Sequence, residues 1–86
     1  MNEAAKQALA PLREQIDSID SQLVALLAKR AKVTAQVGKI KQQYALPVYV
    51  PEREQALLSA RRSQAESLGV SADLAEDVLR RIMRES

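Results

Sequence analysis

Widely spaced cationic side chains are the residues of this sequence best suited to chemistry. They are Arg13, Arg30, Lys41 and Arg53, in a chain of 86 residues that contains no His and no Cys. The absence of both residue types disfavours triad hydrolysis, thiol nucleophiles and His- or Cys-ligated metals. We therefore expect a reaction that depends on placed positive charge and on carboxylates, with no cofactor and no metal.

Three of these cations stand where a structural role and an anion-binding role are both open. Arg30 interrupts an apolar pattern, so its stem can pack while its head reaches solvent, or its guanidinium can be partly buried and paired with an anion. Lys41 either complements a helix C-terminus or grips a small polyanion together with Arg30. Arg53 lies in a first helical turn, where Glu52 and Glu54 can compensate it or where it can form an anion site with the helix N-terminus.

Residues 29–41 carry five positive charges and no acid. Such a run is usually a solvated helix face, although a nucleic-acid binder is a rival interpretation. The net charge of the whole chain is only +2 and it has two tyrosines, which disfavours nucleic acid as a partner.

A long helix must position the first three cations. Nine apolar residues recur three and four positions apart, with one interruption at position 30: Leu9, Leu12, Ile16, Ile19, Leu23, Leu26, Val33, Val37 and Ile40. This heptad pattern predicts a helix over about 11–42, with Pro11 in its first turn and Pro47 beyond its end, although Leu9, which is in register, suggests an earlier start. Such a helix is about 48 Å long, whereas a compact domain of this size is about 30 Å across. A second copy of the chain must therefore cover part of this row of apolar side chains, and we expect an intertwined homodimer.

Residues that start and stop helices divide the rest of the chain into a loop over 43–50 and two shorter helices over about 51–67 and 72–86. Pro51 suits the start of the first, Gly69 its C-terminal stop, and Ser71 the N-cap of the second. The expected apolar faces are Ala56, Leu57, Ala60 and Leu68 on the first, and Leu74, Val78, Leu79, Ile82 and Met83 on the second. The fold class is all-α, with three helices in a single domain over residues 1–86.

The N-terminal residues 1–10 have no long apolar run. We therefore expect neither a signal peptide nor a membrane anchor, no membrane partner, and a cytoplasmic location.

Arg13 lies about 25 Å along the predicted helix from Arg30, too far to share a small ligand with it in one chain. An i,i+4 pair with Asp17 is the simpler role for Arg13 in isolation. If two long helices cross antiparallel near residues 23–24, however, Arg13 of one chain lies between Arg30 and Lys41 of the other. That geometry predicts two symmetric sites, each completed across a dimer.

Several sequence tracts together resemble the all-helical chorismate mutases. They are LREQIDSID (12–20), LLAKR (26–30), VGKIK (37–41) and PVYVPERE (47–54). The tracts VYVPERE (48–54), AESLGV (65–70) and VLRRIMRES (78–86) are most similar to the N-terminal mutase domain of bifunctional chorismate mutase/prephenate dehydrogenases. The resemblance covers nearly the whole chain from position 9 onward.

This resemblance implies a homodimer that shares its long first helices and converts chorismate to prephenate by a Claisen rearrangement. It implies that Lys41 and Arg30 are the catalytic residues, with Lys41 donating to the ether oxygen and to a carboxylate. Arg13 would reach a substrate carboxylate from the partner chain, while Arg30 and Arg53 contribute within the chain.

The resemblance also assigns the remaining substrate contacts. Glu54 would bind the ring hydroxyl with help from the backbone of Val50, where some relatives have an acid, and Ser86 would lie near the ring carboxylate. The family places a Gln or Glu one helical turn after that serine, beyond the last residue of this sequence.

Two other functions stay open at this point. One is an isochorismate pyruvate-lyase, an enzyme whose fold is similar to that of the mutases, although the VPERE tract favours the mutase. The other is a non-catalytic dimerisation or regulatory domain, which would bind a dicarboxylate without turnover. No G-x-G-x-x-G motif is present. A prephenate dehydrogenase activity would therefore require a C-terminal domain in a longer parent protein.

Overall fold

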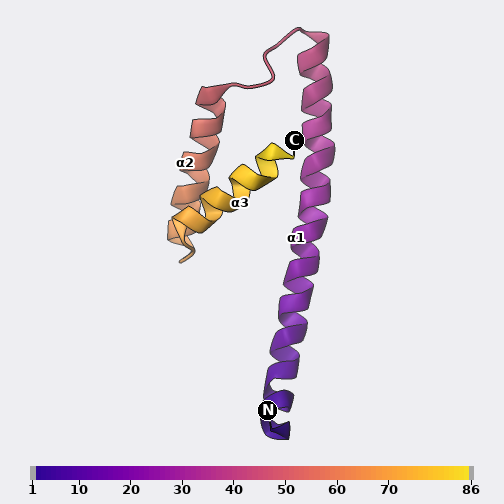
Figure 1. Cartoon of the computed structure of the whole chain (residues 1–86), viewed down its shortest axis with the longest axis vertical. Coiled ribbons are helices and arrows are strands. Elements are labelled where there is room, and N and C mark those ends of the chain that lie inside the picture. The colour runs from indigo at the N-terminus through magenta and orange to yellow at the C-terminus, as the bar shows by residue number, and fades with distance from the viewer. Residues whose placement is uncertain (1, 86) are drawn as a thin grey trace. The chain divides into compact units, whose positions relative to one another are not determined.

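Residues 2–85, the part of the chain that the computed structural model describes, form three helices and no strand (Figure 1). These are α1 (Glu3–Gln43), α2 (Pro51–Ser67) and α3 (Ala72–Arg84). The all-α prediction, with one long and two shorter helices, is confirmed. Contacts divide the chain into two compact units, Met1–Val33 and Thr34–Ser86, so that α1 begins in the first unit and ends in the second.

The long helix α1 begins at Glu3, well before the expected start near position 11. Residues 3–10 are mostly Ala, Glu, Lys, Gln and Leu, which have high helix propensity. Asn2 caps the new start, since its Oδ1 accepts a hydrogen bond from the Ala5 amide at 2.7 Å. Pro11 thus lies inside the helix and leaves one bond of the backbone ladder unmade. Pro11 suits a first turn, but the helix-forming residues before it extend the helix by about two further turns.

The end of α1 is a left-handed capping turn that brings the chain back toward the last helical turn. The Leu46 amide donates to the Lys41 carbonyl at 2.8 Å, and the Ala45 amide donates to the Gln42 carbonyl at 3.3 Å. Ala45 has φ 54°, in the left-handed region where a side chain costs free energy. This turn directs residues 46–50 toward the start of α2.

The end of α2 has the same hydrogen-bond pattern with the residue that such turns favour. Gly69 has φ +74°, and the Val70 amide donates to the Ala65 carbonyl at 2.8 Å. Ser71 then caps α3, because its Oγ accepts a hydrogen bond from the Leu74 amide at 3.2 Å. The expected roles of Gly69 and Ser71 are therefore confirmed.

Exchanging the residue types at the two left-handed positions should change stability in opposite directions. Ala45→Gly relieves backbone strain and should raise the free energy of unfolding by about 0.5–1 kcal/mol, after the entropy cost of glycine is subtracted. Gly69→Ala should lower it by about 1 kcal/mol. A Cβ added at Gly69 meets no atom within 4 Å, so backbone strain alone is tested. Chemical denaturation at one fixed protein concentration measures both changes, and effects of the same sign would contradict the argument.

Helix α3 packs against α2, and the buried core of this pair is small. Leu58 and Ala65 of α2 are the buried hydrophobic residues among those described. Of the apolar face expected on α2, Leu57 is half-buried, whereas Ala56, Ala60 and Leu68 are exposed in the single chain. On α3, Leu74 and Val78 are likewise exposed, whereas Leu79 is half-buried. Both helices carry apolar residues on several sides, and ion pairs join the sides that meet.

Along α1 no residue is buried within the single chain. Its heptad side chains remain open, with exposed fractions of 55% at Ile16 and Leu23 and 52% at Ile40. None of the described helices combines the length and the apolar character needed to cross a membrane.

Candidate functional site

Lys41 connects the last turn of α1 to the loop that follows it. Its Nζ donates a hydrogen bond to the Val48 carbonyl at 2.9 Å, across the chain reversal that Ala45 makes. The side chain is half-buried. An ammonium group has three N–H donors, so this bond leaves capacity for two bonds to a ligand.

The first turn of α2 follows the same loop and presents the next predicted site residues. Val50 is the N-cap residue, in an extended conformation with φ −124° and ψ 99°, and its carbonyl accepts the first helical bond from the Glu54 amide at 3.1 Å. Pro51 occupies the first helical position, where its missing N–H costs nothing. Arg53 and Glu54 therefore lie in the turn where helix amide groups create positive potential, which favours an anion there.

Glu54 has partners on two sides. Its side chain is 25% exposed, and its Oε1 lies 3.3 Å from NH1 of Arg80 on α3. Tyr49 also contacts it, and a hydrogen bond to the Glu54 carboxylate is the main cause that raises the pKa of the Tyr49 phenol. Glu54 is thus held from the preceding loop and from α3 at once.

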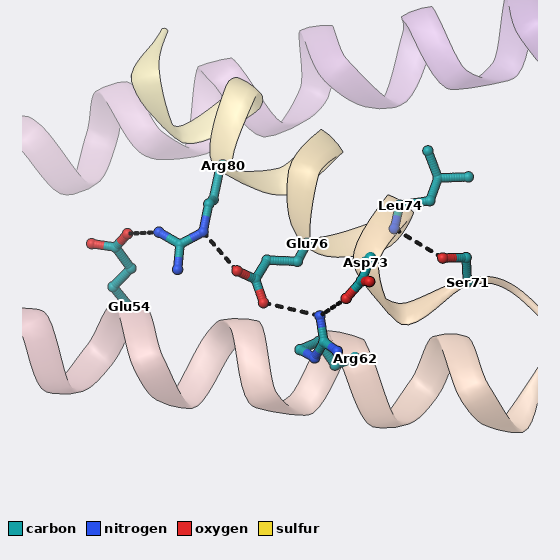
Figure 2. Close-up of polar contacts among 7 residues, drawn as sticks. All are labelled: Glu54, Arg62, Ser71, Asp73, Leu74, Glu76 and Arg80. Atoms are coloured by element: carbon teal, nitrogen blue, oxygen red, sulfur yellow. Dashed lines mark hydrogen bonds and ion pairs between the residues drawn. The ribbon is translucent and has the colours of Figure 1, made fainter.

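Arg80 belongs to a line of alternating charges between α2 and α3 (Figure 2). Its Nε donates to Glu76 Oε2 at 2.8 Å, and Arg62 on α2 bonds Glu76 Oε1 at 3.1 Å and Asp73 Oδ1 at 2.9 Å. The hydrogen bond that Arg80 donates is the main cause that lowers the pKa of Glu76. The hydrogen bond that Arg62 donates to Asp73 is the main cause that raises the pKa of Arg62. We call Glu54, Arg80, Glu76, Arg62 and Asp73 the α2–α3 charge network.

The remaining predicted residues lie elsewhere in the chain. Arg13 and Arg30 are on α1 within the unit Met1–Val33, with Arg13 exposed and Arg30 half-buried. Ser86 lies outside the described residues. Within the unit that starts at Thr34, the structure connects Lys41 to the loop before α2 and places Val50, Arg53 and Glu54 at the start of that helix.

Sequence reasoning missed Arg80 and Tyr49. The i,i+4 spacing of Glu76 and Arg80 could have indicated an ion pair on one helix face. The contact between Glu54 and Arg80 spans 26 positions and depends on how α3 is rotated against α2. No local pattern predicts a contact of that kind.

No metal cluster accounts for these residues in the described part of the chain. Among residues 2–85 no group of three or more acidic side chains is placed to hold a metal ion. An open groove of about 370 Å³ between α2 and α3 is lined by Arg62, Glu76, Arg80 and their neighbours. Its described lining includes none of the residues predicted to bind substrate.

Comparison with known proteins gives a consistent family. Residues 12–86 match the family described as chorismate mutase type II. The chain is 60% identical over 78 residues to the T-protein of Enterobacter agglomerans and 60% identical over 80 residues to the T-protein of Haemophilus influenzae. These alignments cover 91% and 93% of this chain but 21% of each T-protein, so the chain spans about a fifth of their length.

A shorter relative is covered more fully. The chain is 32% identical over 66 residues to the chorismate mutase of Methanocaldococcus jannaschii. That alignment covers 77% of this chain and 67% of the relative. The similarity therefore extends to a protein whose length is mostly accounted for by the helical region described above.

Proposed function

The chain belongs to the chorismate mutase type II family, and from that membership we propose that it converts chorismate to prephenate. The placement of Lys41 is the observation that carries the proposal. Its ammonium group is fixed at the Val48 carbonyl, on the loop that leads into the α2 turn holding Arg53 and Glu54. A cation, a positive helix end and a carboxylate acceptor are the groups that a hydroxylated dicarboxylate substrate requires.

The proposed reaction suits a chain without His and Cys. In this rearrangement the ether C–O bond breaks and a C–C bond forms within one molecule, with no nucleophile and no obligatory proton transfer. Catalysis comes from holding the enolpyruvyl group over the ring in a reactive conformation. A cation fixed at the ether oxygen then stabilises the negative charge that grows there as the bond breaks. Lys41 has that role in the proposed mechanism.

The two carboxylates of the substrate are assigned to arginines. Arg30 and Arg53 bind them within the chain, and Arg13 comes from the partner subunit. A guanidinium group matches the planar geometry of a carboxylate and forms short, charge-assisted bonds with it. These contacts exist in the ground state as well as in the transition state, so they contribute to substrate binding and to orientation of the reacting atoms.

The ring substituents are assigned to the other predicted residues. Glu54 accepts a hydrogen bond from the ring hydroxyl, with the backbone of Val50 beside it at the start of α2. Ser86 is assigned to the ring carboxylate by resemblance. The fixed position of Glu54 between Tyr49 and Arg80 supports its part in the proposal.

A homodimer completes the site in this proposal. The apolar side chains of α1 support it, since a single chain leaves a long row of them open to solvent: Leu12, Ile16, Ile19, Leu23, Leu26, Val33, Val37 and Ile40. Contiguous apolar surface of this kind is typical of a protein–protein interface. A second copy of the same helix offers a matching row.

The proposed context is aromatic amino-acid biosynthesis in the cytoplasm. The chain spans about a fifth of the T-proteins, which supports the proposal that this domain is followed by a C-terminal prephenate dehydrogenase domain in a longer parent. The mutase reaction would then supply the substrate of that second domain.

An assay of the purified protein tests the function. We expect saturable loss of chorismate with equimolar formation of prephenate and no release of pyruvate. Isochorismate serves as the control substrate, because pyruvate release from it would favour the lyase. Absence of chorismate turnover, together with saturable binding of a dicarboxylate transition-state analogue, would instead support a regulatory domain and overturn the proposal.

A further inference from the structure

Arg80 is the one residue of the α2–α3 charge network that links Glu54 to the rest. Its Nε and NH1 nitrogens take different partners, Glu76 Oε2 at 2.8 Å and Glu54 Oε1 at 3.3 Å (Figure 2). The guanidinium group is planar and rigid, so a bond that fixes one nitrogen also fixes the direction of the other. The bond to Glu76 therefore sets the place where Arg80 meets Glu54.

Glu76 is itself held in position. Its second oxygen accepts from Arg62 NH1 at 3.1 Å, and Arg62 also bonds Asp73 at 2.9 Å. The side chain of Glu76 is 26% exposed, compared with 51% for Arg80. The network thus runs from the exposed Asp73 through Arg62 and Glu76 to Glu54, and Arg80 is its last connection before that carboxylate.

Glu54 needs such a support because it stands at a helix start on a flexible side chain. A glutamate has several rotatable bonds, and fixing them on binding costs free energy. A carboxylate that is already oriented accepts a substrate hydroxyl without that cost. Tyr49 contacts Glu54 from the loop before α2 at the same time, and Arg80 is the contact that ties the carboxylate to α3.

We infer that Arg80 is a positioning residue of the substrate site, which holds the Glu54 carboxylate in the orientation that accepts the ring hydroxyl. This inference rests on the proposed function for its consequence in catalysis. It assigns to α3 a part in substrate recognition that is distinct from its packing on α2. Arg80 has no contact with the substrate in this inference and acts through Glu54.

Kinetics of matched variants test the inference. Arg80→Met should lower kcat/KM about tenfold, mainly by raising KM, because one charged hydrogen bond to substrate loses its orientation. Arg80→Lys, which keeps the charge, should restore part of the loss. Combining Glu54→Gln with Arg80→Met should cost little more than Glu54→Gln alone, since both act on one contact. Additive losses would contradict action through Glu54.

Arg62→Met is the control for a purely structural effect. It removes an arginine from the same network and the same helix pair but leaves the Glu54–Arg80 contact in place. We expect a similar fall in thermal stability for Arg62→Met and Arg80→Met, with a clearly smaller loss of kcat/KM in the first, because Arg62 reaches Glu54 only through Glu76 and Arg80. Equal loss of kcat/KM in both, or in neither, would overturn the inference.

The phenol of Tyr49 reports the position of Glu54 without any substrate. The Glu54 hydrogen bond and the charges of Glu54 and Glu52 raise the pKa of Tyr49, while the charge of Arg80 lowers it. In a Tyr44→Phe background Tyr49 is the single tyrosine, and its ionisation can be followed by absorbance. If Arg80 holds Glu54 in place, Arg80→Met lets the carboxylate leave and the pKa of Tyr49 falls toward about 10. If Arg80 supplies charge alone, that pKa rises.

The two readouts separate the inference from the proposed function. A wild-type protein that does not turn over chorismate refutes the function, yet the direction of the Tyr49 shift still decides whether Arg80 positions Glu54. An active wild type whose Arg80→Met variant keeps kcat/KM, or raises the pKa of Tyr49, refutes the inference alone.

Discussion

Replacing Lys41 with alanine should lower kcat for chorismate rearrangement by roughly two orders of magnitude, as removal of one oxyanion donor does in other enzymes. The ammonium group stabilises charge that exists only as the ether bond breaks, so kcat should fall more than KM rises. Val48 keeps the Lys41 Nζ in place through a bond of 2.9 Å before substrate arrives. Initial rates of chorismate loss over a range of concentrations measure both constants.

Lys39→Ala is the matched control for that experiment. It removes the same charge from the same helix, two positions earlier and about 200° around the axis. We expect its kcat to stay within about twofold of wild type, because surface charges away from the site contribute little. Circular dichroism confirms that both variants are folded. An unchanged kcat in folded Lys41→Ala would remove Lys41 from the mechanism.

The helix ends show which parts of a fold can be predicted from short segments. Gly69 and Ser71 act through their own backbone and side-chain preferences, so their roles follow from residue type and position. The turn after α1 was harder, because Ala45 adopts the conformation that glycine usually occupies. Its two capping bonds offset part of that strain, and they are not evident from an alanine in the sequence.

The rotation of one helix against another could not be predicted in the same way. Apolar residues occur on more than one side of α2 and α3, and the pattern alone does not single out Leu58 and Ala65 as the buried residues of α2. The pairs Arg62–Asp73 and Arg62–Glu76 join positions 11 and 14 apart. Side chains of opposite charge are common throughout this sequence, so only the packed structure shows which of them meet.

The same distinction between local and long-range contacts decides which parts of the candidate site could be predicted. Residues that share one turn or one loop, such as Arg53 with Glu54, could be grouped from the sequence. The support that Glu54 receives from Arg80 could not, because it requires the placement of α3. Assignment of Arg13 requires a further step, since it depends on a second chain. That step stays a prediction, which mixed dimers can test.

Mixing the inactive variants Arg13→Ala and Arg30→Ala should restore activity. If Arg13 acts in the site of the partner subunit, a mixed dimer has one site with both lesions and one site with neither. After equal mixing and full exchange, half of the dimers are mixed, so about a quarter of all sites should be intact. The rate should therefore approach about a quarter of the wild-type rate, measured after exchange is verified with chains of different mass.

The pair Arg30→Ala and Arg53→Ala provides the opposite expectation from the same procedure. Both side chains serve the site of their own chain in the proposal, so each site of a mixed dimer keeps one lesion and no activity returns. An Arg13 that acted within its own chain would also give no recovery with Arg30→Ala, for the same reason. Recovery in the first mixture and none in the second therefore requires that Arg13 crosses between chains. No recovery of activity in either mixture, with exchange verified, would contradict the shared site. All the arginines would then act within one chain, where about 25 Å of α1 separates Arg13 from Arg30.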